Sequence, residues 1–156
     1  MCHSPTEQTL SPSRRKEEGI IRLAISHHAP EGYKAVAALD GYVSRNLDPI
    51  LLDVVKLRAS QLNGCAFCVD IHATDLEKHG VPARKIFAVN VWQETNFFTE
   101  EERAALALTE QITHVFDGID DDVWREASEV FNERELSDLV LAVVSREVGD
   151  GRRVVR

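Results

Sequence analysis

Long apolar runs, an excess of positive charge and numerous cysteines are all missing from this sequence. No apolar run approaches the length of a membrane-spanning helix, so we expect a soluble protein. Its 18 Lys and Arg residues are outnumbered by 26 Asp and Glu residues, which gives a formal net charge of -8. Nucleic acids and anionic membranes attract concentrated positive charge, so this balance argues against both as partners. We therefore expect the partners to be small molecules or further copies of the chain.

The small number of cysteines indicates a reducing compartment. There are three, and only Cys65 and Cys68 form a C-x-x-C pair, which is too few for the disulfide framework of a small secreted protein. The basic cluster at residues 14–16 is not followed by an apolar segment of signal-peptide type. We accordingly expect a cytoplasmic protein, with Cys2 as an unpaired thiol in the N-terminal tail.

Alternation with period two, the mark of a half-buried strand, is also missing, so the sequence predicts an all-α fold. With 156 residues and 44% hydrophobic content, the chain can bury one core of ordinary size. Residues 1–18 mix Ser, Pro and charge and are predicted to be a disordered tail. Residues 19–148 are predicted to form one compact bundle of about six to seven helices. Residues 149–156, which contain two glycines, are predicted to be an irregular C-terminal tail.

Helix-capping patterns mark where several of these helices begin. Asp48 stands before Pro49, a pair typical of an N-cap and a first helical residue. Thr99 with Glu102, and Asn132 with Glu135, have the spacing of a capping box. The helices so expected run over residues 30–45, 49–62, 65–79, 82–94 and 100–116, with a short helix around Trp124 and a last helix from Asn132.

The C-x-x-C pair and a following histidine form the candidate site. Cys65, Cys68 and His72 have the spacing i, i+3 and i+7, which places all three on one face of a helix. Asn63 and Gly64 predict a turn just before them, so the positive end of the helix dipole would lie beside the thiols and favour the thiolate form. Two buried thiols of no function are the ordinary alternative. The spacing and the nearby histidine favour a redox pair.

Two further side chains belong to this hypothesis. His72 follows Cys68 by four residues and is interpreted as the proton partner of a thiol. Asp53 is the single acid in an otherwise apolar helix, where a buried carboxylate needs a partner. Arg58 in the same helix is a candidate for that partner.

A zinc site is the rival interpretation of the same residues. The two cysteines and His72 supply three ligands, and the fourth would be Asp53, His79 or a distant residue. The sequence holds no second C-x-x-C pair and no H-x3-H pair, so the zinc signal is incomplete. We therefore expect neither a metal nor a cofactor, and we interpret His79 as a surface or hydrogen-bonded histidine.

The stretch from Asp53 to His72 resembles the alkylhydroperoxidase (AhpD-like) branch of the carboxymuconolactone decarboxylase family. Redox members of that family carry a glutamate, then C-x-x-C after an eleven-residue gap, then three residues and a histidine. The segment LLDVVKLRASQLNGCAFCVDIH has this spacing, with Asp53 in place of the glutamate. Phe67 stands where some members have a histidine, and SREVGDGRRVVR replaces the usual end of the last helix. The resemblance extends to about Val144 through PEGYKAVAALDGYV, WQETNFFTEEERAALALTE and LSDLVLAVV.

This resemblance implies an all-helical fold that assembles as trimers or higher multiples and reduces peroxides with thiols. By position, Cys68 would be the thiolate that attacks the peroxide and Cys65 the thiol that resolves the product. His72 and Asp53 would move the protons. An external dithiol of lipoyl or thioredoxin type would then restore both thiols.

Three alternatives remain at the level of sequence. The first is a general thiol-disulfide oxidoreductase that reduces protein disulfides. The second is a non-redox enzyme of the decarboxylase branch, which would act on a lactone acid and would not need cysteines. The third is a helical oligomer without enzymatic activity that senses oxidation.

Overall fold

The computed structural model describes residues 24–116 and 118–148, and all regular structure in these ranges is helical. This confirms the predicted all-α class, while the predicted tails, residues 1–18 and 149–156, and Cys2 lie outside the described residues. No helix within the described ranges is both long enough and apolar enough to cross a membrane. The elements are α1 (Ile25–His28), α2 (Pro30–Asn46), α3 (Pro49–Leu62), α4 (Ala66–Lys78), α5 (Ala83–Ala88), the 3-10 helix η2 (Val89–Glu94), α6 (Glu100–Thr113), α7 (Asp121–Val130) and α8 (Glu133–Val148).

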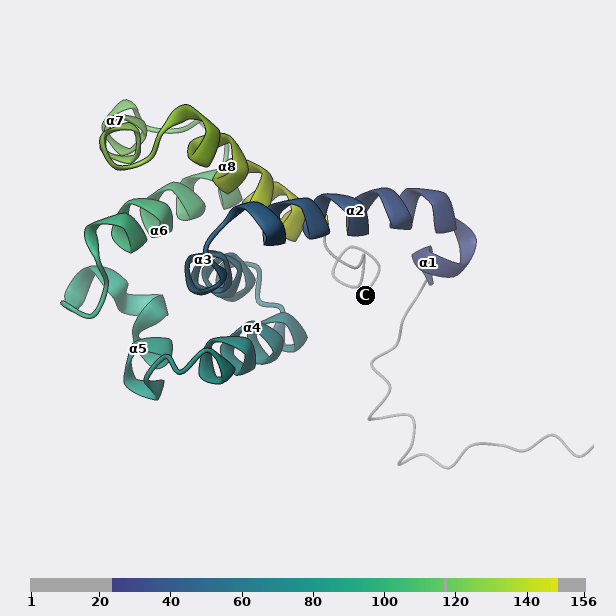
Figure 1. The fold of residues 1–156 in the computed structure, drawn as a ribbon, viewed down its shortest axis with the longest axis horizontal. Coiled ribbons are helices and arrows are strands. Elements are labelled where there is room, and N and C mark those ends of the chain that lie inside the picture. The colour runs from purple at the N-terminus through teal and green to yellow at the C-terminus, as the bar shows by residue number, and fades with distance from the viewer. Residues whose placement is uncertain (1–23, 117, 149–156) are drawn as a thin grey trace, which may run out of the picture.

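Helix α3 is the centre of the bundle. It packs against α4, α6 and α8, and Figure 1 shows it end-on with α4 on one side and α6 and α8 on the other. Leu52 and Val55 of α3 belong to a core cluster shared with α6, α7 and α8, whereas Val54 and Leu57 belong to a second cluster shared with α4, α5, η2 and α6. The nearly all-round apolar character of this helix is explained by its two buried sides.

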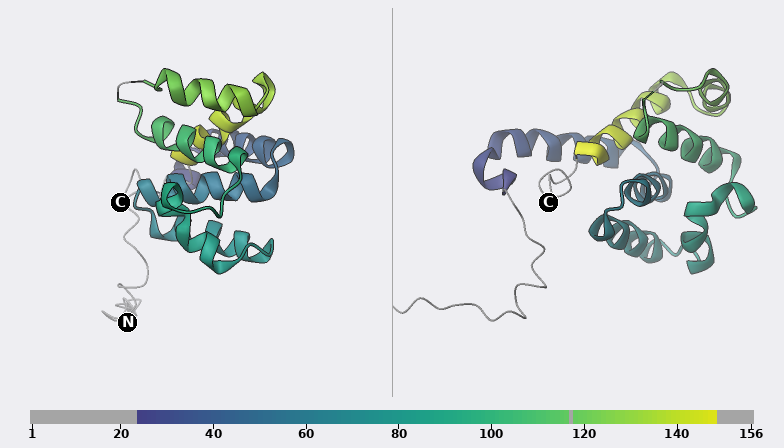
Figure 2. Two further views of the ribbon diagram at one scale, coloured as in Figure 1. Left: turned by 90° about the vertical axis from the view of Figure 1, so that its left-hand side faces the viewer. Right: turned by 180° about the vertical axis from the view of Figure 1, so that it is seen from behind.

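The long helix α2 lies along α8 and continues beyond it, so that its N-terminal half projects from the bundle (Figures 1 and 2). Only Val43, near its C-terminal end, is buried. Tyr33 and Val36 in the projecting half are partly exposed. Both side chains line one wall of the cavity that is described below.

The predicted capping patterns are present. Asp48 Oδ1 accepts hydrogen bonds from the backbone N–H groups of Ile50 and Leu51, each at 3.0 Å. Thr99 and Glu102 form a complete capping box at the start of α6. At the start of α8, the Asn132 N–H donates to Glu135 and the Glu135 N–H donates to Asn132. Side-chain acceptors thus satisfy N–H groups that a helix end leaves without partners.

Helix α4 begins as predicted, directly after the turn at Gly64. Gly64 has φ of +62°, a conformation that glycine adopts without the strain that a Cβ would cause. Cys65 is the N-cap residue of α4, and its N–H donates to the Ser60 carbonyl at 3.0 Å. At the other end Gly80 has φ of +79°. The two glycines thus delimit the helix that carries the candidate site.

Two helix boundaries differ from the prediction. The single helix expected over residues 82–94 is divided into α5 and η2, with a non-helical Val91 at φ -129° and ψ 33°. The helix expected to reach Phe116 ends at Thr113, and His114 already has non-helical φ of -114° and ψ of 47°. Apolar spacing does not distinguish an α-helix from a kinked 3-10 continuation, which explains the first difference. For the second, no glycine or proline lies between Thr113 and Gly118 to mark the end of α6.

Candidate functional site

Cys65 and Cys68 form a disulfide at the N-terminus of α4, with their Cα atoms 5.4 Å apart. The Cys68 N–H donates to the Cys65 carbonyl at 3.0 Å, so the first turn of the helix holds the two residues together. Each residue is only 6% exposed. The sulfurs are thus bonded to each other within the protein.

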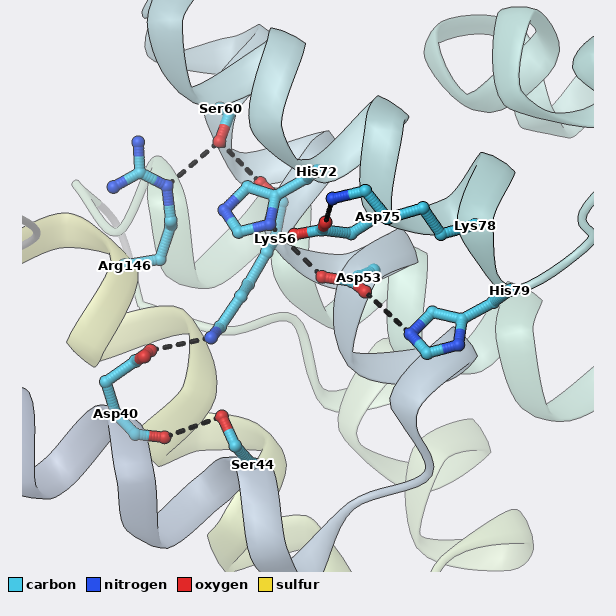
Figure 3. Close-up of polar contacts among 10 residues, drawn as sticks. All are labelled: Asp40, Ser44, Asp53, Lys56, Ser60, His72, Asp75, Lys78, His79 and Arg146. Atoms are coloured by element: carbon cyan, nitrogen blue, oxygen red, sulfur yellow. Dashed lines mark hydrogen bonds and ion pairs between the residues drawn. The ribbon is translucent and has the colours of Figure 1, made fainter.

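Asp53 of α3 contacts His72 of α4, with 3.2 Å between Asp53 Oδ1 and His72 Nδ1 (Figure 3). Both side chains are 14% exposed, so the contact is shielded from most of the solvent. The contact arises because α3 and α4 pack closely along their length. Asp53 and His72 are thus in direct contact between α3 and α4, and His72 lies on the same helix as Cys68.

The partner suggested for Asp53 from the sequence, Arg58, is wrong. Arg58 donates instead to Glu110 of α6, with 2.7 Å between Arg58 Nε and Glu110 Oε1. Positions 53 and 58 are five residues apart, and a helix brings together residues three or four apart. The two side chains therefore face different neighbours of α3.

Two further side chains, from Asp75 of α4 and from its C-cap residue His79, lie beside this pair. Asp75 was missed as a site residue, whereas His79 was considered only as a possible ligand of a zinc site with the cysteines. His79 Nε2 lies 3.7 Å from the second carboxylate oxygen of Asp53 (Figure 3). Asp75, between the two histidines in sequence, places a carboxylate oxygen near both Asp53 and His72, and one ligand atom from each of these three residues lies within 4.8 Å of the others. The spacing of His72, Asp75 and His79, i, i+3 and i+7, was the available signal. This spacing alone does not identify a site, because the carboxylate of Asp53 that lies beside these side chains comes from another helix.

A cavity of about 270 Å³ opens beside Cys68 and His72. It is bounded by α2, α3, α4 and α8. Cys65 does not line it, so Cys68 is the cysteine that faces this space. The apolar walls come from Val36, Ala37, Phe67 and Ile71, and the polar part from Tyr33, Asp40, Lys56, Ser145 and Arg146.

Salt bridges and hydrogen bonds organise the polar part of the cavity. Lys56 is 6% exposed and its Nζ lies 2.6 Å from Asp40 Oδ1, which compensates the cost of burying an ammonium group. Arg146 Nε donates to Ser60 Oγ at 2.9 Å, and Ser60 in turn donates to the Lys56 carbonyl at 2.6 Å (Figure 3). None of these residues was recognised in the sequence, because they come from helices far apart in the chain.

Comparisons with known proteins agree with this architecture. Residues 30–111 match the carboxymuconolactone decarboxylase family. The uncharacterized protein YdfG of Bacillus subtilis is 34% identical over 124 residues, which cover 78% of this chain and 84% of that protein. YnjA of Escherichia coli, also uncharacterized, is 28% identical over 111 residues, which cover 69% of this chain and 61% of that protein.

A solved structure is similar over almost its whole length. It is the crystal structure of an Agrobacterium tumefaciens protein of unknown function, described as a candidate antioxidant defence protein AhpD. The similarity has a TM-score of 0.80 at 32% identity and covers 86% of this chain and 93% of that chain. The predicted AhpD-like helical fold is thereby confirmed.

Proposed function

The chain belongs to the carboxymuconolactone decarboxylase family, and on that premise we propose that it is a thiol-dependent hydroperoxide reductase. The observation that carries the proposal is the Cys65–Cys68 disulfide beside the Asp53–His72 pair, with Cys68 facing a cavity. A thiol pair that closes to a disulfide, an adjacent acid-base pair and a space for a small substrate are what such a reaction needs.

In the proposed reaction, the Cys68 thiolate attacks the distal oxygen of ROOH and the O–O bond breaks. The products are a sulfenic acid on Cys68 and an alkoxide, which takes a proton to become ROH. The Cys65 thiol then condenses with the sulfenic acid, which forms the disulfide and releases water. An external dithiol reduces this disulfide by exchange and is itself oxidised to a disulfide.

His72 and Asp53 are proposed to move the protons in this reaction. The imidazole takes the Cys68 thiol proton and returns one to the alkoxide. The direct contact of Asp53 with His72 Nδ1 at 3.2 Å supports this role for its side chain, which is one methylene shorter than the family's glutamate. With Nδ1 directed to the carboxylate, Nε2 is the nitrogen left for exchange with the thiol and substrate.

The cavity favours organic hydroperoxides as substrates. A space of about 270 Å³ is near the lower end of pockets that hold small organic molecules. Four of its side chains, Val36, Ala37, Phe67 and Ile71, are apolar and suit an alkyl group rather than a second polar group. We therefore expect alkyl hydroperoxides to be reduced faster than hydrogen peroxide.

The burial of the two cysteines limits which reductants can reach them. Both cysteines are only 6% exposed, which favours a slender dithiol of lipoyl type over the broad surface of a thioredoxin-like protein.

Exposed apolar side chains bear on the assembly. Large apolar side chains such as Phe87 and Trp124 are exposed by 78% and 42%, which supports the expected trimer or higher homo-oligomer. Such a cycle is suited to the cytoplasm, where dithiol reductants are maintained.

Single cysteine variants test the proposal, with Cys2→Ser as the matched control because it removes the one thiol outside the pair. Cys68→Ser is expected to abolish turnover of cumene hydroperoxide with dihydrolipoamide. Cys65→Ser is expected to stop after one equivalent, with a sulfenic acid or mixed disulfide trapped on Cys68. Turnover is followed by peroxide consumption and the trapped species by intact-protein mass. Full turnover in both variants would contradict the proposal.

The same set of proteins discriminates the other functions. Reduction of insulin disulfides together with slow peroxide turnover would indicate a general thiol-disulfide oxidoreductase. Activity on a lactone acid that survives loss of both cysteines would indicate the decarboxylase branch. Stoichiometric oxidation without turnover would indicate a redox sensor.

A further inference from the structure

One face of α4 presents metal-binding side chains to α3. His72, Asp75 and His79 are spaced by three and four residues, so their side chains project from the same side of the helix. Asp53 of α3 lies opposite this face, and Figure 3 shows its carboxylate between the two imidazole rings with Asp75 nearby. Four donors from two packed helices thus converge on one region. The ligands of metal sites in helical bundles are arranged in a similar way.

The spacing of the donor atoms suits a small divalent ion. His72 Nδ1 and His79 Nε2 lie 3.2 and 3.7 Å from the two oxygens of Asp53, and donors from Asp53, His72 and Asp75 lie within 4.8 Å of one another. Ligands bound tetrahedrally at about 2.1 Å from zinc are about 3.4 Å apart. Asp53, His72 and Asp75 are thus already grouped closely enough to share one ion, and His79 would join them as a fourth ligand by rotation of its exposed side chain.

Chemical type and charge agree with this geometry. Two imidazoles and two carboxylates are ligands that Zn²⁺ and Co²⁺ accept, and the two negative charges neutralise a divalent ion. Asp53 and His72 are shielded, whereas the side chains of Asp75 and His79 are 36% and 43% exposed, which leaves a route from solvent. We propose that Asp53, His72, Asp75 and His79 bind one divalent transition-metal ion, with Zn²⁺ as the reference ion, at a site without sulfur.

This site differs from the zinc site considered from the sequence. That site required the two cysteines, which are bonded to each other in the structure. The cysteines lie at the N-terminus of α4, whereas Asp75 and His79 lie toward its C-terminus. Oxidation of the cysteines therefore leaves the metal ligands intact.

Lys78 competes for one of the ligands. Its Nζ lies 2.7 Å from Asp75 Oδ1, so a positive charge already lies against this carboxylate. The Lys78 side chain is 68% exposed and can turn into solvent when a metal takes the carboxylate. Removal of this positive charge by Lys78→Gln is expected to increase metal affinity.

Metal binding would have a consequence for the reaction proposed above, and this consequence rests on that proposal. A metal on His72 Nδ1 and on Asp53 withdraws both groups from proton transfer. Zn²⁺ is therefore expected to inhibit peroxide turnover reversibly, with chelator restoring the rate.

Direct binding tests the site independently of any activity. Zn²⁺ is titrated by calorimetry into the disulfide form and into the Cys65→Ser/Cys68→Ser protein, and Co²⁺ absorption reports the ligand type. We expect one equivalent to bind to both proteins, with no thiolate-to-cobalt band in either. Asp75→Asn and His79→Gln are expected to lower affinity at least tenfold, whereas Glu77→Gln, an exposed position on the same helix, is the matched control and should leave it unchanged.

Three other outcomes of the binding experiments would overturn the proposed metal site. Absence of saturable binding to the disulfide form would remove the site. Binding that is lost with the cysteines, or that shows a thiolate band, would assign the metal to sulfur. Equal affinity in Asp75→Asn, His79→Gln and Glu77→Gln would exclude the named ligands, and circular dichroism of these exposed-site variants verifies that they are folded. Binding without inhibition would leave the site standing and count against the proton role of His72.

Discussion

Asp53 and Glu110 are two shielded carboxylates on opposite sides of α3, and their partners differ in kind. Glu110 accepts hydrogen bonds from Arg58 Nε at 2.7 Å, Trp92 Nε1 at 2.8 Å and Gln93 Nε2 at 3.4 Å. Its donors are permanently charged or permanently protonated. Among the residues that the structure describes, the ion-pair partners of Asp53 are the imidazole nitrogens of His72 and His79, at 3.2 and 3.7 Å.

Under the proposed reaction, the difference separates a structural carboxylate, Glu110, from one that takes part in proton transfer, Asp53. The partners of Glu110 keep their hydrogens throughout the physiological pH range, so that network is fixed. An imidazole can act as a general acid or base, so the partners of Asp53 are of a kind that can exchange a proton during a reaction. Burial of an acid therefore does not by itself reveal its role, whereas the chemistry of its donors does.

The largest expected effect is on stability, at Glu110. Glu110→Ala leaves the guanidinium of Arg58, whose side chain is 14% exposed, and the Trp92 indole N–H without their acceptor. We expect the free energy of unfolding to fall by about 3 kcal/mol, measured by urea denaturation. Peroxide turnover per folded molecule should be unchanged. A loss below about 1 kcal/mol would contradict the structural role assigned to Glu110.

The next effect is on activity, at Asp53. Asp53→Asn keeps the shape of the side chain but no longer supplies a negative charge to a protonated His72. We expect turnover to fall roughly 10- to 100-fold while the free energy of unfolding changes by less than about 1 kcal/mol. Steady-state peroxide consumption and urea denaturation measure the two. Asp53→Glu, which restores the family's side chain, is the matched control and should stay within a few-fold of the wild type.

The smallest effect is expected at His79. Its 3.7 Å contact with Asp53 is long and its side chain is 43% exposed, so in metal-free buffer it adds little to the position or charge of the carboxylate. His79→Gln should change peroxide turnover by less than about threefold. A loss as large as that of Asp53→Asn would place His79 in the proton path and would enlarge the reactive set.

Local features of the fold could be predicted from the sequence because they depend on residues three or four apart. The Asp48 cap, the Thr99–Glu102 box and the start of α4 at Cys65 all involve neighbours in the chain. The same reasoning placed Cys68 and His72 on one helix face, where both line the cavity, whereas Cys65 precedes the helix and does not line it. It failed at Val91, where the apolar pattern continues but the backbone leaves the helical region.

Partners from other helices could not be predicted in this way. Arg58 was assigned to Asp53 because both lie in one helix, yet its partner is Glu110, 52 residues away. The Arg146–Ser60 bond in the cavity joins residues 86 apart. Such pairs follow from how α3 packs against α6 and α8, and a single sequence carries no local signal of that packing.

The position of Cys65 has a final consequence for durability. Cys65 precedes the helix, with extended backbone angles of φ -92° and ψ 92°, whereas Cys68 lies in the first turn. In the proposed cycle we expect the bond between them to close and open by side-chain torsions, because the Cα atoms are 5.4 Å apart and the Cys68 N–H donates to the Cys65 carbonyl. Repeated oxidation is then expected to leave α4 folded, so that turnover would not expose its backbone to proteolysis.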